Sequence, residues 1–184
     1  MAPLPGPRPD AAPASLLRIF VYGTLMRGGR FHDEFCRDAL SIEEAQVLGQ
    51  LYTTGPYPVL SVPDSLILAV GTADPLADLA TQDRSAAFAD AADLLTPAQL
   101  LRTTSRTSEG GPHADWELIP GELITLGDPT ARLGALDHLE GFNPGAKSLY
   151  RRVLLPVRVI ERGEVEVGWG WSAIASCSTV GASS

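Results

Sequence analysis

The stretch that decides the fold is LLRIFVYGTL, residues 16–25. Leu16 to Tyr22 is a short run of apolar, β-branched and aromatic residues, which is typical of a buried strand. Gly23 follows at once, so the strand is expected to end in a tight loop, Gly23-Thr24-Leu25. A strand that ends this way leaves backbone N–H groups free, and such groups bind anions. A strand followed by glycine is also common without any function, so this stretch alone does not identify a site.

Short elements are expected to follow this strand. They are a glycine loop at 26–30, a short helix at 31–40, a strand at 45–52, a turn at 55–58 and a short extended piece at 59–62. Phe31 and Phe35 would share the apolar face of the helix. The turn is expected because Pro56 and Pro58 have no N–H to donate to a strand ladder.

The middle of the chain, residues 61–115, is the least regular part. From residue 73 its composition shifts to Ala, Leu and Asp. A strand at 66–71, helical character at 85–95, a helix start at Thr96-Pro97 and a loop at 103–112 are the expected elements. The segment either covers a cavity, as long functional loops do, or is an ordinary excursion over the surface.

Core character returns in the C-terminal part. Residues 121–126 predict a strand, and Asp128-Pro129 predicts a helix with Asp as the N-cap and Gly141 just past its end. Strands at 150–160 and 165–173 would form a hairpin through Arg162-Gly163. Strands therefore dominate, with one or two helices between them. This pattern predicts an α+β fold in which the strands curl into a small barrel with flanking helices.

Length and charge narrow the class of protein. The chain has 184 residues, which fits one domain with a large insertion. The formal net charge of −8 disfavours binding to nucleic acid and to anionic membranes. No apolar run approaches the roughly 20 residues that cross a bilayer. We therefore expect a cytoplasmic protein without nucleic-acid or membrane partners.

The termini and the cysteines fit this expectation. Residues 1–15 are rich in Pro and Ala and lack the charged start and apolar centre of a signal peptide, so they are expected to be a flexible leader. Residues 176–184 are expected to be a flexible tail. One domain would then span 16–175, with an insertion at about 61–115. Cys36 and Cys177 belong to no CxxC motif and are expected to be reduced.

Several catalytic motifs are absent from the sequence. There is no GxxxxGK[ST] loop, no GxGxxG after a strand and no GxSxG elbow. The histidines His32, His113 and His138 show no metal-ligand spacing, so no metal site and no cofactor are expected.

A second candidate motif is LDHLEGFNPG, residues 136–145. Glu140 lies at the C-terminal end of the expected helix, where the helix dipole disfavours a carboxylate. Its pKa should therefore rise, more so if it is buried, which suits a general acid/base near neutral pH. The alternative is a solvated Glu that merely ends a helix.

Five motifs in this order resemble the gamma-glutamylcyclotransferase-like family, which includes AIG2-like proteins and gamma-glutamylamine cyclotransferases. The motifs are VYGTL, GPYP, GELI, LDHLEGFNPG and SLYRR, and the resemblance covers roughly residues 18–60 and 116–173. It implies a small mixed barrel with one open cavity. It also implies that Glu140 is the acid/base and that Tyr22-Gly23-Thr24-Leu25 holds the γ-glutamyl group. Tyr150 would help to orient the substrate, and Pro58 would line the cavity.

The resemblance implies an enzyme that converts a γ-glutamyl amine or peptide to 5-oxoproline and a free amine or amino acid. The alternative is a non-catalytic module on the same barrel that binds a small amino-acid-like ligand. A third hypothesis is an acidic interaction protein that acts through 61–115. An intact LEGF segment favours the enzyme. The leaving amine and the oligomeric state have no signal in the sequence.

Overall fold

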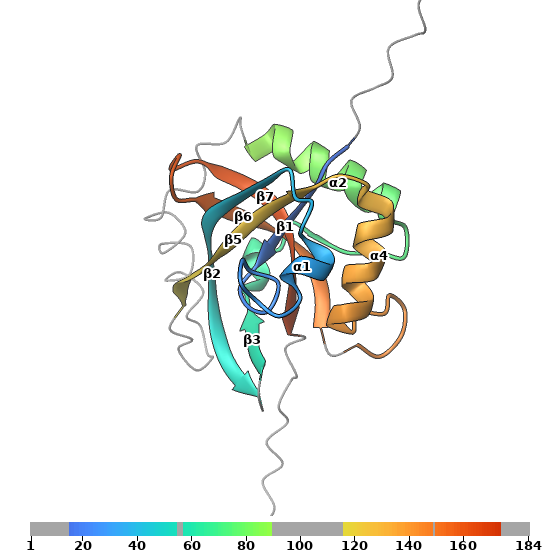
Figure 1. Cartoon of the computed structure of the whole chain (residues 1–184), viewed down its shortest axis with the longest axis horizontal. Coiled ribbons are helices and arrows are strands. Elements are labelled where there is room, and N and C mark those ends of the chain that lie inside the picture. The colour runs from blue at the N-terminus through green and yellow to red at the C-terminus, as the bar shows by residue number, and fades with distance from the viewer. Residues whose placement is uncertain (1–14, 55–56, 90–115, 149, 174–184) are drawn as a thin grey trace, which may run out of the picture.

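The computed structural model describes residues 15–54, 57–89, 116–148 and 150–173 (Figure 1). The strands are β1 Leu17–Val21, β2 Ser41–Thr54, β3 Tyr57–Ser61, β4 Ala69–Val70, β5 Glu117–Leu126, β6 Tyr150–Val159 and β7 Val165–Ala173. The helices are α1 His32–Phe35, α2 Pro75–Ala89, α4 Pro129–Glu140 and the 3₁₀ turn Asp64–Leu66. The predicted leader, the tail, the elements expected between 90 and 115, and Cys177 lie outside the described residues.

Five of the strands form a closed barrel. The sheet order is β3-β2-β5-β1-β7-β6-β4, and a further pairing of β2 with β6 closes the ring. This closing pairing joins Ala45 to Val159 and Gln46 to Arg158. The pairing of β1 with β7 is parallel, whereas the other pairings are antiparallel. The predicted α+β fold with a small mixed barrel and flanking helices is therefore confirmed.

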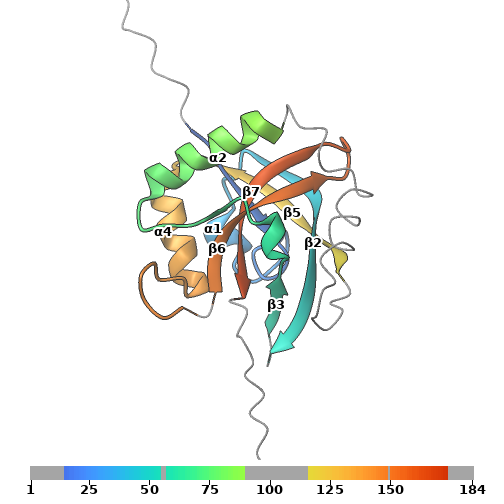
Figure 2. The same cartoon turned by 180° about the vertical axis from the view of Figure 1, so that it is seen from behind.

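Most residues of strands β1, β5, β6 and β7 are buried, on both faces of the sheet, whereas β2 is partly exposed. Phe20, Val47, Leu123 and Val157 belong to a core cluster drawn from the strands and the segment after β3. A second cluster joins the opposite faces of β1, β5 and β7 to Leu79 of α2 and to α4. The first cluster is the barrel interior, and the second lies between the barrel wall and the two helices (Figures 1 and 2). Burial on both faces explains why β1 is apolar at every position except Arg18, which is partly buried and forms an ion pair with Glu166.

Helix α2 corrects the prediction for the middle segment. Helical character was expected from 85, but the helix begins at Pro75. Asp74 precedes it, and its Oδ1 accepts hydrogen bonds from the amides of Leu76 at 3.0 Å and Ala77 at 3.2 Å. Asp74-Pro75 is thus a capped helix start, the same signal that was read at Asp128-Pro129.

At Asp128 the predicted cap differs in detail. The residue precedes α4, but its side chain makes no capping hydrogen bond and its φ is 47°, in the left-handed region. The predicted helix end is confirmed, because Gly141 has φ 67° and its amide bonds to the carbonyl oxygen of His138. The helix at 31–40 was predicted too long, since α1 spans His32–Phe35.

The predicted turn at 55–58 is wrong for its last two residues, because both belong to β3. Pro58 lies within β3 and pairs with Thr53 of β2. Since β3 is the last strand at its end of the sheet, the proline's missing N–H faces no further strand. The strand expected at 45–52 is also longer, because β2 begins at Ser41 and continues to Thr54.

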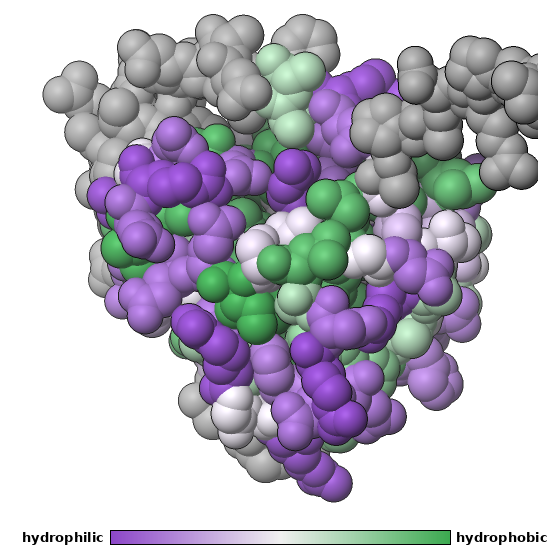
Figure 3. All heavy atoms as spheres, turned by 45° about the horizontal axis from the view of Figure 1, so that its top comes forward, coloured by the Kyte–Doolittle hydropathy of each residue, from purple (hydrophilic) through white to green (hydrophobic). Residues whose placement is uncertain are grey.

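The face shown in Figure 3 is mostly hydrophilic, with a small group of apolar residues near its centre. Large apolar side chains that are exposed include Leu40, Leu68, Val70 and Leu76. None of the described helices is long and apolar enough to span a membrane.

Candidate active site

A pocket of about 430 Å³ opens where β1 ends beside the C-terminal end of α4. It brings together all seven residues predicted for the site, although they come from four separate segments. They are Tyr22, Gly23, Thr24, Leu25, Pro58, Glu140 and Tyr150. Phe20, Val21, Phe31, Leu139, Gly141 and Trp171 complete the lining. The fold brings these residues together in one pocket, while their roles toward a substrate stay predictions.

Glu140 is the acidic residue of this pocket. It is the last residue of α4, and the left-handed Gly141 turns the chain away immediately after it. Burial raises the pKa of Glu140 to about 7, and the negative charge of Asp137 adds to the rise. A carboxyl group with this pKa exchanges a proton near neutral pH, as a general acid/base must.

The loop after β1 offers backbone donors to the pocket. Its chain folds back on itself, with hydrogen bonds from the Met26 amide to the Gly23 carbonyl at 3.0 Å and from the Phe31 amide to the Thr24 carbonyl at 2.9 Å. Within the described part of the chain, the amides of Gly23, Thr24 and Leu25 donate to no protein acceptor. Free amides at a strand end are the anion-binding feature that the sequence predicted.

Two side chains hold this loop from behind. Glu122 of β5 is buried, and its carboxylate accepts hydrogen bonds from the Arg27 amide at 2.8 Å and from Arg27 Nε at 2.6 Å. His32 Nδ1 lies 2.8 Å from the carbonyl oxygen of Leu25. Glu122, Arg27 and His32 do not line the pocket, so these contacts fix the loop from outside it.

Tyr22 forms one wall and ties three segments together. Its hydroxyl donates to the carbonyl oxygen of Trp171 at 3.3 Å and accepts from the amide of Leu60 at 3.2 Å. Burial raises the pKa of this phenol, with a further rise from Glu140, so it stays neutral near pH 7. Tyr150, whose pKa is also raised by burial and by Glu140, faces the same carboxyl from β6.

Sequence reasoning missed part of the apolar wall. Phe31 was assigned only to a helix face, and Trp171 was not among the residues predicted for the site. In the structure Trp171 is buried, lines the pocket and donates its indole N–H to Asp137 at 3.1 Å. Its neighbour Trp169 is wholly buried in the core. The alternation of side chains along β7 could have suggested that both tryptophans share a face, but not which of them reaches the pocket.

No cysteine or histidine of the described residues lines this pocket. Cys36 is buried in the core, where burial raises the pKa of its thiol to about 11. Within the ranges that the structure describes, no three His, Cys, Asp or Glu side chains lie together as a metal site would require.

Comparison with known proteins supports the resemblance read from the motifs. The family model described as gamma-glutamyl cyclotransferase, AIG2-like, matches residues 19–75. This match spans β1, its loop and the elements up to the start of α2. The match includes residues 61–75, which were expected to belong to the insertion, and it does not reach Glu140.

A solved structure of an AIG2-like protein from Mus musculus has 16% sequence identity to this chain, with a TM-score of 0.46. The alignment covers 89% of this chain and 80% of that chain. No curated protein sequence matches the chain.

Proposed function

We propose that the chain is a gamma-glutamylcyclotransferase-like enzyme that releases 5-oxoproline from a γ-glutamyl amine or peptide. The observation that carries the proposal is the meeting of two groups in one pocket. One is a carboxyl group, Glu140, whose pKa is about 7. The other is a row of three backbone amides, Gly23 to Leu25, that no described residue uses. The match of residues 19–75 to the AIG2-like family supports the same conclusion.

The amides suit the anionic parts of the substrate. A γ-glutamyl group carries an α-carboxylate, and its γ-carbonyl oxygen gains negative charge during attack. Backbone N–H groups held in place before the reaction stabilise both without having to reorganise. The apolar walls formed by Phe31, Pro58 and Trp171 lower the local dielectric, which strengthens these hydrogen bonds.

The nucleophile in this reaction belongs to the substrate. Its α-amine attacks its own γ-carbonyl carbon, a C–N bond closes the five-membered ring, and the bond from the γ-carbon to the leaving nitrogen breaks. The products are 5-oxoproline and the free amine. The protein therefore has to hold the γ-glutamyl chain folded, and this orientation supplies several kcal/mol of the rate enhancement.

Glu140 then moves the proton. As a carboxylate it accepts a proton from the α-ammonium, which frees the attacking lone pair. As a carboxylic acid it returns that proton to the leaving nitrogen. It also accepts the second proton, which the ring nitrogen loses on closure, and this proton passes to the released amine to give an ammonium group. One group serves both steps best when its pKa lies near the working pH, as the burial of Glu140 ensures. Tyr22 and Tyr150 are neutral hydrogen-bonding groups beside it.

The raised pKa of Glu140 favours an enzyme over a binding module on the same barrel. A site that only binds an amino-acid-like ligand has no need of a carboxyl group poised to exchange a proton. The leaving amine is not specified, because the remaining described lining is apolar or aromatic apart from the loop backbone and Thr24. A cytoplasmic location stays a prediction from the sequence.

The test is release of 5-oxoproline from a panel of γ-glutamyl dipeptides and γ-glutamyl alkyl and aryl amines. Turnover of any class establishes the reaction, and the preferred member identifies the leaving group. Absence of turnover across the panel, from folded protein that binds one of these compounds, would instead support the binding module.

A further inference from the structure

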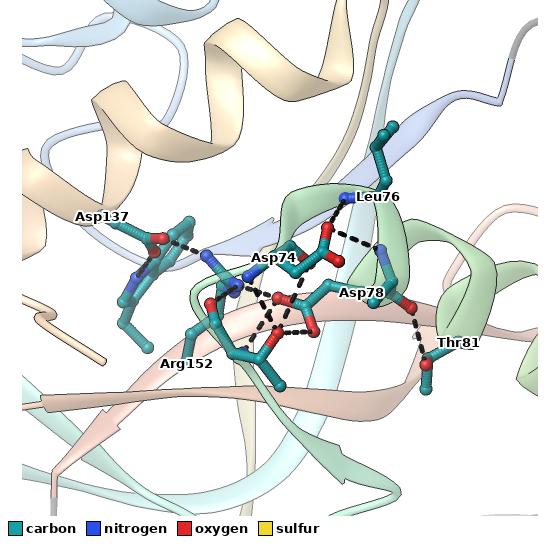
Figure 4. Close-up of polar contacts among 9 residues, drawn as sticks. Asp74, Leu76, Asp78, Thr81, Asp137 and Arg152 are labelled. Atoms are coloured by element: carbon teal, nitrogen blue, oxygen red, sulfur yellow. Dashed lines mark hydrogen bonds and ion pairs between the residues drawn. The ribbon is translucent and has the colours of Figure 1, made fainter. Parts of the chain in front are cut away.

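Arg152 is a buried cation that does not line the pocket and has no role in the proposed reaction. Arg152 of β6 is wholly buried, and its guanidinium forms ion pairs with Asp137 of α4 and Asp78 of α2 (Figure 4). Its Nη2 also donates to the carbonyl oxygen of Thr72 at 3.1 Å. We call Arg152, Asp78 and Asp137 the Arg152 bridge.

The Arg152 bridge contacts the end of α4 and the residues after it, on both sides of Glu140 in the sequence. Asp137 precedes Glu140 by three residues, so the two side chains lie on the same face of the helix. Phe142 follows Glu140 by two residues, and the Arg152 guanidinium lies 5.2 Å from the centre of its ring. The Phe142 amide also donates to the Asp137 carbonyl oxygen at 2.9 Å. One guanidinium thus fixes the residues before and after Glu140.

The far side of the bridge is built by the segment around the start of α2. Asp78 is buried and accepts further hydrogen bonds from the Thr72 amide at 2.9 Å and from Thr72 Oγ1 at 3.0 Å. A Cβ at Gly71 would lie 2.5 Å from Arg152 Nε, so only glycine leaves room for the guanidinium there. Residues 71–78 therefore enclose Arg152 rather than merely crossing the surface.

Stability alone does not explain such an arrangement. Removing charges from water costs free energy that a buried ion pair often fails to recover, and apolar replacements are frequently as stable. A buried bridge does, however, fix the orientation of the groups that it joins. Here those groups are the last turn of α4 and, through the indole N–H bonded to Asp137, the pocket wall at Trp171.

We propose that Arg152 is a positioning residue that fixes the last turn of α4, and with it the Glu140 carboxyl group, through Asp137. The inference rests on the proposed function only for its effect on turnover. Asp137 has two effects that separate experiments distinguish. It connects Glu140's helix turn to Arg152, and its negative charge disfavours the Glu140 carboxylate.

The titratable groups that face Glu140 in the described structure are Asp137 on α4, Tyr22 after β1 and Tyr150 on β6. Both phenols are neutral near pH 7, because burial and the Glu140 charge raise their pKa values. Arg152 lies behind Asp137, and Asp78 lies on the far side of Arg152. Removing the negative charge of Asp137 should therefore lower the pKa of Glu140.

The experiment compares Asp137→Asn with Asp78→Asn, which remove one carboxylate each from opposite sides of the same guanidinium. Glu140 is titrated directly by carboxyl-carbon NMR, a readout that needs no turnover. Asp137→Asn should move the Glu140 midpoint to lower pH, while Asp78→Asn should move it far less. Equal midpoints in wild type and Asp137→Asn, or equal shifts in both variants, would overturn the proposal.

Turnover supplies the second readout. Asp137→Asn should shift the acid limb of kcat/KM to lower pH and reduce the plateau of kcat by roughly 10- to 100-fold, as expected for a slightly misplaced catalytic group. If wild type shows no turnover, the proposed function fails, but the NMR titration and the Trp171 signal described next still test the coupling of Asp137 to Glu140.

A third readout does not require either Asp variant to fold. The indole N–H signal of Trp171 should move with a midpoint near pH 7 in wild type, because Asp137 joins it to the turn that holds Glu140. The movement should vanish in Glu140→Gln. An indole signal that is flat in wild type would contradict the proposal.

Discussion

Glu122 of β5 binds Arg27 twice, accepting a hydrogen bond from its backbone amide at 2.8 Å and another from its Nε at 2.6 Å. The carboxylate is buried, whereas the arginine side chain is half exposed. Glu122 therefore anchors the loop that presents the amides of Gly23, Thr24 and Leu25, rather than taking part in the reaction.

Replacing this anchor should weaken substrate binding. In Glu122→Gln the side chain loses its charge and one of its acceptor positions, so the loop should be held less firmly. We expect a higher KM and a loss of about 1–3 kcal/mol in the free energy of unfolding. Steady-state kinetics measures KM, and urea unfolding measures the free energy of unfolding. Arg27→Gln is the matched control, because it keeps the backbone amide bond and should be milder. A Glu122→Gln enzyme with unchanged KM would contradict the anchoring role.

The two tyrosines of the pocket should respond differently to loss of the hydroxyl. Tyr22→Phe leaves the Trp171 carbonyl and the Leu60 amide without their partner, so we expect about 1–3 kcal/mol lower stability. Tyr150→Phe breaks no hydrogen bond to a described residue, so its stability should change by less than about 0.5 kcal/mol. If Tyr150 orients the substrate, its variant should instead raise KM about tenfold. Thermal unfolding and steady-state kinetics of both variants test this difference. Equal losses of stability in Tyr22→Phe and Tyr150→Phe would contradict it.

Glu140 should make stability depend on pH in an unusual direction for a carboxyl group. Its pKa is raised from 4.5 to about 7, so the folded protein binds a proton more tightly than the unfolded chain does. This contribution to stability is complete below pH 4.5 and is lost as pH rises through about 7. Relative to Glu140→Gln, wild type should therefore lose up to about 3 kcal/mol between pH 4.5 and pH 8.

Urea unfolding of both proteins at several pH values measures this difference. Glu161→Gln, in the exposed turn before β7, is the control and should show no such trend. A constant difference between wild type and Glu140→Gln across this range would show that Glu140 has an ordinary pKa.

Gly71 tests the enclosure of Arg152 by steric means. In Gly71→Ala the new methyl group would overlap the guanidinium, so we expect a loss of about 1–3 kcal/mol. Gly134→Ala is the matched control, because its Cβ meets nothing within 4 Å on an exposed face of α4. Alanine should stabilise that helix by about 0.5–1 kcal/mol. In thermal unfolding, Gly71→Ala should therefore lower the stability and Gly134→Ala should raise it. Unchanged stability of Gly71→Ala would mean that Arg152 is loosely held.

The sequence was most informative where local signals are strong. The run from Leu16 to Tyr22, the glycine after Glu140 and the two C-terminal strands were read correctly, because burial on both faces and helix termination leave marks on adjacent residues. The start of α2 was missed although Asp74-Pro75 carries the same capping signal as Asp128-Pro129. The Ala- and Asp-rich sequence that follows has no clear apolar stripe to mark a helix.

The Arg152 bridge shows what sequence reasoning could not supply. Arg152 follows Arg151 and precedes the apolar run of residues 153–157 in β6, and an arginine on the core side of a strand requires a buried acid. That signal was available, but it does not say which acid. Asp137 and Asp78 are separated from Arg152 by 15 and 74 residues, so only the closed barrel with α2 and α4 packed on it brings the three together.

The most direct test of the central claim is release of 5-oxoproline by wild type, Glu140→Gln and Glu161→Gln on the same γ-glutamyl substrate. We predict turnover by wild type and by Glu161→Gln, and loss of at least roughly 100-fold in a folded Glu140→Gln, because a positioned acid/base contributes about 10²- to 10⁴-fold. Turnover by Glu140→Gln at the wild-type rate would contradict the assignment of the acid/base.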